Sequence, residues 1–90
     1  MNSVFEALAH PVRRDILKLL RKRSMSAGEL SEHFSIAKPT LSGHFTVLKG
    51  ADLVTTERQG TTIMYHLNTS AMEDALGAFM SLAGVKRKDD

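Results

Sequence analysis

The sequence has 90 residues, contains no cysteine and carries a net charge of +2. A chain of this length forms one small domain that buries only about 60–65% of its unfolded surface. The absence of cysteine excludes disulfides, thiolate zinc sites and iron–sulfur clusters, so oligomerisation is the remaining route to extra stability. Because no apolar run is long enough for a transmembrane helix or a signal peptide, we expect a cytoplasmic protein without membrane insertion.

Positive charge is concentrated in the first half of the chain. Residues 10–50 contain eight Lys and Arg residues but only three Asp and Glu residues. Residues 51–90 contain four basic and six acidic residues. A basic half of this kind indicates an anionic partner such as nucleic acid, and the alternative is an ordinary solvated helix surface.

Two helices are predicted at the start of the chain. Helical spacing of apolar residues predicts the first over residues 3–9. Pro11 suits the first turn of a helix, so a second helix begins there and runs to Lys22. The apolar stripe of this second helix consists of Val12, Ile16, Leu19 and Leu20.

The next segments predict a helix-turn-helix. Ser26 and Glu29 have the spacing of a capping box, which begins a short helix, and residues 35–37 form a three-residue turn. Another helix must begin near Pro39, since proline is tolerated only in a first turn, and Gly50 is its expected end. Its core-facing residues are Leu41, Phe45 and Leu48.

A hairpin and a last helix complete the chain. Two segments rich in β-branched residues, 53–58 and 61–67, flank Gly60, which predicts a two-stranded hairpin. A last helix follows, for which Asn68, Thr69 and Ser70 offer caps and residues 70–73 form a second capping box; it ends at Gly84. Its apolar stripe consists of Met72, Leu76, Phe79, Met80 and Ala83.

This order of elements is typical of a winged helix-turn-helix, an α+β fold that is mainly α with a β-hairpin wing. We expect the folded domain to span residues 1–84 and residues 85–90 to form a charged, frayed tail.

Four segments carry a family resemblance: HPVRRDIL at residues 10–17, AKPTLSGHF at residues 37–45, LV at residues 53–54 and RQG at residues 58–60. They resemble the ArsR/SmtB family of winged-helix transcriptional repressors. Within that family, MSAGELSEHF at residues 25–34 and LNT at residues 67–69 most resemble the SdpR-type autorepressors. The resemblance implies a repressor that controls its own operon.

Two positions near the expected recognition helix depart from the family pattern. The family usually has Ser at the position of Ala37, so a helix cap worth about 1 kcal/mol is missing here. It usually has a larger polar residue at the position of Gly43, where glycine costs about 1 kcal/mol relative to alanine. The alternative use of Gly43 is close approach of the backbone to DNA. Base preferences therefore do not transfer from relatives.

DNA-binding candidates lie on the face of this helix opposite Leu41 and Phe45. Thr40 and Ser42 are the base-edge candidates, because the major groove admits a helix with short polar side chains. Basic residues meet phosphates, which position a protein without reading sequence. The candidates are Lys38, Thr40, Ser42, Gly43, Thr46 and Lys49 on the helix, Arg58 and Gln59 at the hairpin tip, and, more weakly, Arg14 and Arg23.

Neither a metal site nor a catalytic site is expected. No two of the four histidines have the i, i+4 spacing of a helical metal site. Relatives with a Cys-x-Cys metal site would place those cysteines at Ser26 and Gly28. No nucleophile motif frames a serine. His33 and His44 flank core positions, so we expect both to pack between helices, and we expect no cofactor.

A homodimer is expected, because one recognition helix reads too few base pairs for specificity and two-fold dimers read paired half-sites. The family pairs its first and last helices across the dimer, which here implicates Val4, Phe5, Leu8, Met72, Leu76, Phe79 and Met80. The predicted function is a repressor that occupies an imperfect inverted repeat in double-stranded DNA. The alternatives are a protein-interaction winged helix without DNA binding and a repressor with a small-molecule pocket between the dimer helices. No particular inducer is indicated.

Overall fold

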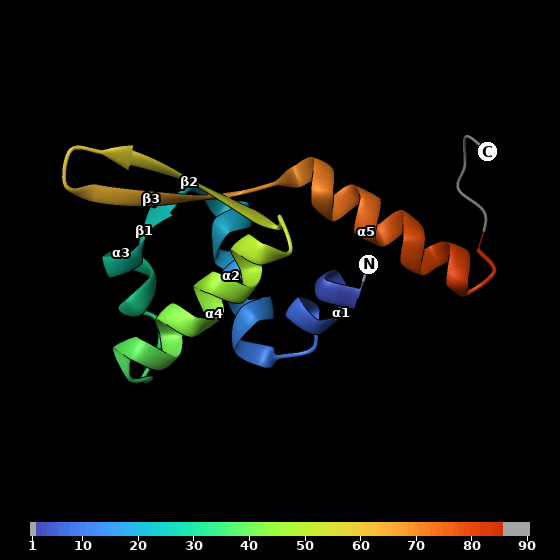
Figure 1. Cartoon of the computed structure of the whole chain (residues 1–90), viewed down its shortest axis with the longest axis horizontal. Coiled ribbons are helices and arrows are strands. Elements are labelled where there is room, and N and C mark those ends of the chain that lie inside the picture. The colour runs from blue at the N-terminus through green and yellow to red at the C-terminus, as the bar shows by residue number, and fades with distance from the viewer. Residues whose placement is uncertain (1, 86–90) are drawn as a thin grey trace.

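The computed structural model describes residues 2–85 and has the winged helix-turn-helix fold that the sequence predicts (Figure 1). Two helices lead into the helix-turn-helix, the hairpin follows it, and a helix ends the described chain. The elements are α1 (Asn2–Leu8), α2 (Pro11–Lys22), β1 (Met25–Ser26), α3 (Ala27–Ser31), α4 (Lys38–Gly50), β2 (Val54–Gln59), β3 (Thr62–Leu67) and α5 (Thr69–Leu82). Within the described part of the chain, no helix combines the length and the apolar character that crossing a membrane requires.

The wing is part of a three-stranded antiparallel sheet with the order β1-β3-β2. The hairpin register pairs Val54 with Leu67 and Gln59 with Thr62. Gly60 has a φ of 65°, so it adopts the left-handed conformation that the turn requires. The short strand β1, which the sequence pattern did not predict, pairs Met25 with Tyr65. This pairing ties the root of the wing to the start of α3.

The core lies between the helix-turn-helix, α2 and the sheet. Its fully buried large side chains are Ile16, Leu30, Leu48 and Leu53. Burying one such side chain stabilises the fold by roughly 1.5–3 kcal/mol. Leu41 and Phe45 are buried as predicted. On α2 the buried stripe differs slightly from the prediction, because Leu17 is buried whereas Val12 and Leu19 are half-buried.

The start of α3 confirms the predicted capping box. The Glu29 amide donates to the Ser26 hydroxyl at 3.1 Å, and the Ser26 amide donates to the Glu29 carboxylate at 3.0 Å. The helix then ends earlier than predicted, at Ser31, so residues 32–37 connect it to α4. His33 lies in this connection and is exposed, so the prediction that it packs between helices is wrong.

The end of α4 and the start of α5 lie close to their predicted positions. Gly50 is the last residue of α4, as predicted, and Asp52 beyond it adopts a left-handed conformation with a φ of 60°. Asn68, one of the three predicted caps, caps α5, since its side-chain oxygen accepts from the Ala71 amide at 3.3 Å. The capping box expected at residues 70–73 is not the start of this helix.

The last helix, α5, extends away from the body of the domain with α1 beside it (Figure 1). The Phe5 and Phe79 rings meet edge to face with their centroids 6.4 Å apart. Only Ala75 and Gly77 of α5 are buried. Gly84 follows the helix with a φ of 78°, as expected for a glycine at a helix end. Of the expected tail, residues 86–90 lie outside the described residues.

Candidate nucleic-acid interface

The helix α4 separates a buried face from an exposed polar one. Leu41, Phe45 and Leu48 pack into the core, and the opposite face is open to solvent. All six candidates on this helix are exposed: Lys38, Thr40, Ser42, Gly43, Thr46 and Lys49. The Thr46 hydroxyl donates its proton to the Ser42 carbonyl at 3.1 Å. Toward a ligand, the Thr46 oxygen can therefore only accept a hydrogen bond. A helix with one apolar face fixed in the core can present this polar face to the major groove.

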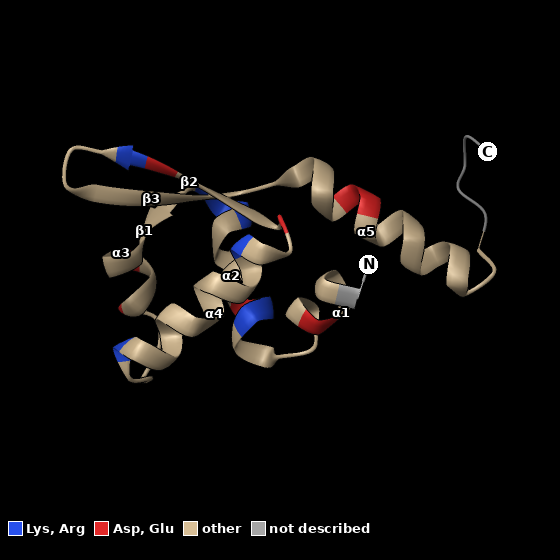
Figure 2. Cartoon of the chain, in the orientation of Figure 1, with Lys and Arg blue, Asp and Glu red and all other residues tan. Residues whose placement is uncertain are grey.

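The start of α4 lacks a side-chain cap, as the sequence predicts. Ala37 occupies the N-cap position and makes no side-chain hydrogen bond to the first turn. The positive end of the helix dipole and the uncapped amides at this end favour negative charge. Lys38, the first residue of α4, adds a formal positive charge at the same place (Figure 2).

The wing carries its basic residue close to the turn (Figure 2). Arg58 pairs with Ile63 across the hairpin and is exposed. The neighbouring Gln59 donates to the Glu57 carboxylate at 3.3 Å, and His66 lies 3.2 Å from the same oxygen. Glu57 therefore occupies the amide of Gln59 on one face of β2, whereas Arg58 projects from the opposite face, which leaves Arg58 as the stronger phosphate candidate of the wing.

Arg14 and Arg23 both make contacts within the chain. Arg14 donates to the Leu8 carbonyl at 2.8 Å, at the end of α1. Arg23 forms an ion pair with Glu29 at 2.9 Å. The hydrogen bond from the Ser26 amide, followed by the interaction with Arg23, lowers the pKa of the Glu29 carboxyl. Arg14 thus connects α2 to the end of α1, and Arg23 connects the end of α2 to α3. Each arginine therefore stabilises the packing of the domain.

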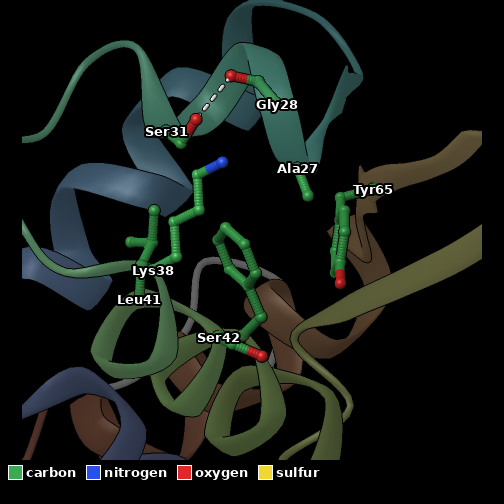
Figure 3. Close-up of a pocket in the computed structure, with 8 residues that line it drawn as sticks. Ala27, Gly28, Ser31, Lys38, Leu41, Ser42 and Tyr65 are labelled. Carbon is green, nitrogen blue, oxygen red and sulfur yellow. Dashed lines mark hydrogen bonds between the residues drawn. The ribbon is translucent and has the colours of Figure 1, made fainter.

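A cavity of about 290 Å³ lies beside the recognition face, between α3, α4 and β3 (Figure 3). Its walls are formed by Leu41, by Phe45 and by Tyr65, whose ring centroid is 4.8 Å from that of Phe45. Burial raises the pKa of the Tyr65 hydroxyl. Lys38 and Ser42 also line the cavity, which is therefore an apolar hollow with polar groups from the candidate DNA-binding face.

The predicted dimer residues form an apolar surface over α1 and α5. Leu76 and Phe79 are each 60% exposed, and Leu82, which the sequence reasoning missed, is 75% exposed. Leu82 follows Phe79 at i+3, and this spacing was the signal that could have identified it. The remaining candidates are half-buried: Val4, Phe5, Leu8, Met72 and Met80. A smaller cavity of about 140 Å³ separates α1 from α5 on this surface.

Two of the four histidines, His10 and His44, pack ring against ring with their centroids 4.4 Å apart. Among residues 2–85, no three His, Asp or Glu side chains are grouped closely enough to hold a metal ion. His66 instead joins Ser24, whose hydroxyl is 2.5 Å from its Nδ1, to Glu57 on β2. His44 is buried on α4, as predicted, and contacts Arg13, a residue that the sequence reasoning did not select.

Comparisons with known proteins agree with this geometry. A helix-turn-helix domain family matches residues 8–57. The chain is 45% identical over 76 residues to the transcriptional repressor SdpR of Bacillus subtilis, covering 84% of each protein. It is 40% identical over 68 residues to an arsenical resistance operon repressor of Staphylococcus xylosus, covering 76% of this chain and 65% of that protein.

A solved structure extends the agreement to the fold. The crystal structure of an ArsR family transcriptional regulator has a TM-score of 0.77 to this chain at 27% identity, covering 94% of this chain and 97% of that one. The chain belongs to the ArsR/SmtB family of winged-helix transcriptional repressors.

Proposed function

We propose that the protein is a cytoplasmic, homodimeric repressor that occupies an imperfect inverted repeat, with α4 of each protomer in the major groove. The observation that carries this proposal is the division of α4 into a buried apolar face and an exposed face of hydroxyls and lysines. Its membership of a repressor family supports the same reading. Occupying a promoter in this way blocks transcription without any catalytic step.

The contacts divide by side-chain type. Thr40 and Ser42 are short and exposed, so they can reach base edges once α4 enters the groove. Lys38 and Lys49 lie at the two ends of the helix, where the phosphate backbone passes. Arg58 near the wing tip meets the backbone or enters a minor groove, where arginine is favoured.

The apolar surface of α1 and α5 supports a dimer. Phe79 and Leu76 are large apolar side chains that are mostly exposed in a single chain. Pairing these helices with their copies removes this surface from water and joins two recognition helices in one assembly. A repressor of this kind reads two half-sites, which gives the specificity that one helix lacks.

The test begins with footprinting on the DNA upstream of the protein's own gene, followed by titration of operator and scrambled duplexes at several salt concentrations. Thr40→Ala and Ser42→Ala are expected to weaken operator binding by about 1–3 kcal/mol each and to leave scrambled binding nearly unchanged. Lys38→Ala and Arg58→Ala are expected to weaken both and to lower the salt slope by about two per dimer.

Ser70→Ala is the matched control, because Ser70 is an exposed hydroxyl on α5. It is expected to bind both duplexes like the natural chain. If Thr40→Ala and Ser42→Ala keep the same preference for the operator as the control, α4 does not read the bases. If the natural chain binds no duplex even at low salt, the protein-interaction alternative is favoured.

A further inference from the structure

The Arg13 guanidinium joins three helices. Its Nε donates to the Ala7 carbonyl and its Nη2 to the Glu6 carbonyl, each at 2.9 Å. Its Nη1 lies 3.1 Å from Nδ1 of His44 on α4. The last carbonyls of a helix have no partner within that helix, so Arg13 caps α1 from α2. The same side chain then reaches α4, the candidate recognition helix.

His44 is held in a restricted environment. Its side chain is buried on α4, with a residue exposure of 8%. The His10 ring packs on it with the centroids 4.4 Å apart, and His10 Nδ1 accepts from the Val12 amide to cap α2. The titratable and charged groups facing His44 are therefore His10 and Arg13, both from the start of α2. Through Arg13, His44 is connected to the carbonyls of α1, and Glu6 on that helix is exposed.

The contact defines the protonation state of His44. Arginine only donates hydrogen bonds, so His44 Nδ1 must be the acceptor and the ring must be neutral with its proton on Nε2. A proton on Nδ1 removes the acceptor and places a second cation beside the guanidinium. Within residues 2–85, no carboxylate forms an ion pair with either side chain to offset this. Burial, followed by the charges of His10 and Arg13, lowers the pKa of His44.

We propose that Arg13 and His44 are positioning residues for DNA binding, which set the orientation of α4 relative to α1 only while the His44 ring is neutral. This inference rests on the proposed function, in which α1 belongs to the dimer and α4 to the DNA interface. In such a dimer, the distance between the two recognition helices depends on how each α4 is held relative to the interface helix α1. Arg13 contacts both α1 and His44 on α4, so it helps to set that distance.

Three variants test the contact. Arg13→Lys keeps the positive charge but lacks the planar fork that makes all three contacts. His44→Gln is neutral at every pH and retains a side-chain oxygen that can accept from Arg13. Lys18→Ala removes an exposed basic residue of the same helix and is the control for loss of charge. Operator and scrambled affinity are measured from pH 7.5 to 5.5, together with the dimer mass and the melting temperature.

Arg13→Lys is expected to lose about tenfold in operator affinity at pH 7.5, while the dimer mass and scrambled binding are unchanged, because charge-assisted hydrogen bonds are lost. Lys18→Ala is expected to keep the operator preference. The natural chain is expected to lose operator affinity only at the acid end of this range, since the lowered pKa of His44 keeps its ring neutral at higher pH. A loss of affinity at low pH distinguishes protonation of His44 from protonation of exposed histidines, because added positive charge on exposed histidines strengthens binding to phosphates. His44→Gln is expected to keep its operator affinity at pH 5.5.

Two results would overturn the positioning role while leaving the proposed function intact. One is an Arg13→Lys protein that binds the operator like the natural chain. The other is a His44→Gln protein with the same pH profile as the natural chain, and this comparison decides the matter if Arg13→Lys does not fold. A natural chain that binds no duplex at any pH contradicts the proposed function itself.

Discussion

The uncapped start of α4 is a defined weakness that one substitution can repair. Ala37 is the N-cap residue, with φ −57° and ψ 139°, and its carbonyl accepts from the Leu41 amide at 3.0 Å. A capping side chain accepts from the second or third amide of the helix. Pro39, the second residue, has no amide proton, so Thr40 carries the only amide that a cap can reach here. Ala37→Ser places an oxygen within reach of that amide.

The expected gain follows from the setting of the residue. A serine cap is worth about 1 kcal/mol relative to alanine, with a range of about 0.5–2 kcal/mol. Ala37 is exposed, so the hydroxyl is not transferred into an apolar environment and no packed neighbour must move. For a domain of this size, 1 kcal/mol corresponds to a rise of about 4–8 °C in the melting temperature.

The assay is thermal unfolding followed by circular dichroism. All variants are compared at one protein concentration, because dimerisation makes the melting temperature depend on concentration. Ala37→Val is the control, since it adds side-chain atoms but no acceptor. We expect Ala37→Ser to melt above the natural chain and Ala37→Val to show no gain. If Ala37→Ser melts no higher than the natural chain, the helix start is already satisfied and the reasoning is wrong.

Four other changes have definite expected outcomes. Gly43→Ala is expected to raise the free energy of unfolding by about 1 kcal/mol in urea titration, because nothing beyond the adjoining turns of its own helix lies within 4 Å of the added Cβ; a loss would mean that the site requires glycine. Leu48→Ala is expected to lower it by about 2–5 kcal/mol, since the side chain is fully buried, and a smaller loss would contradict that burial. Phe79→Glu is expected to give the mass of a single chain in sedimentation at micromolar concentration, where the natural chain gives twice that mass; a monomeric natural chain would refute the dimer. Titration calorimetry with zinc is expected to show no tight binding, because the described residues provide no ligand cluster, and stoichiometric tight binding would contradict this.

The local features of the fold were predictable because their causes lie close together in the sequence. The capping box at Ser26 depends on a residue three positions away, and the wing turn depends on Gly60 between two β-branched segments. The apolar spacing of Leu41, Phe45 and Leu48 determined which face of α4 enters the core. The exposed candidate face followed from this, since it is the opposite side of the same helix.

The partners of long polar side chains were decided only by the tertiary structure. Arg14 and Arg23 are indistinguishable from phosphate-binding arginines in sequence, yet both contact other parts of the same chain. The strand β1 is two residues long and shows no periodicity, so only its pairing with β3 reveals it. Such contacts join residues from different elements, which periodicity along one element does not relate.

The clearest case is Arg13 and His44, which lie 31 residues apart in the chain and 3.1 Å apart in space. The sequence predicted that His44 packs between helices, because it flanks a core position of α4. It gave no indication that the packing partner is an arginine capping the end of α1. That partner is determined by how α1, α2 and α4 pack against one another. Because of this packing, a positive charge on His44 would remove its hydrogen bond with Arg13, which no local sequence pattern indicates.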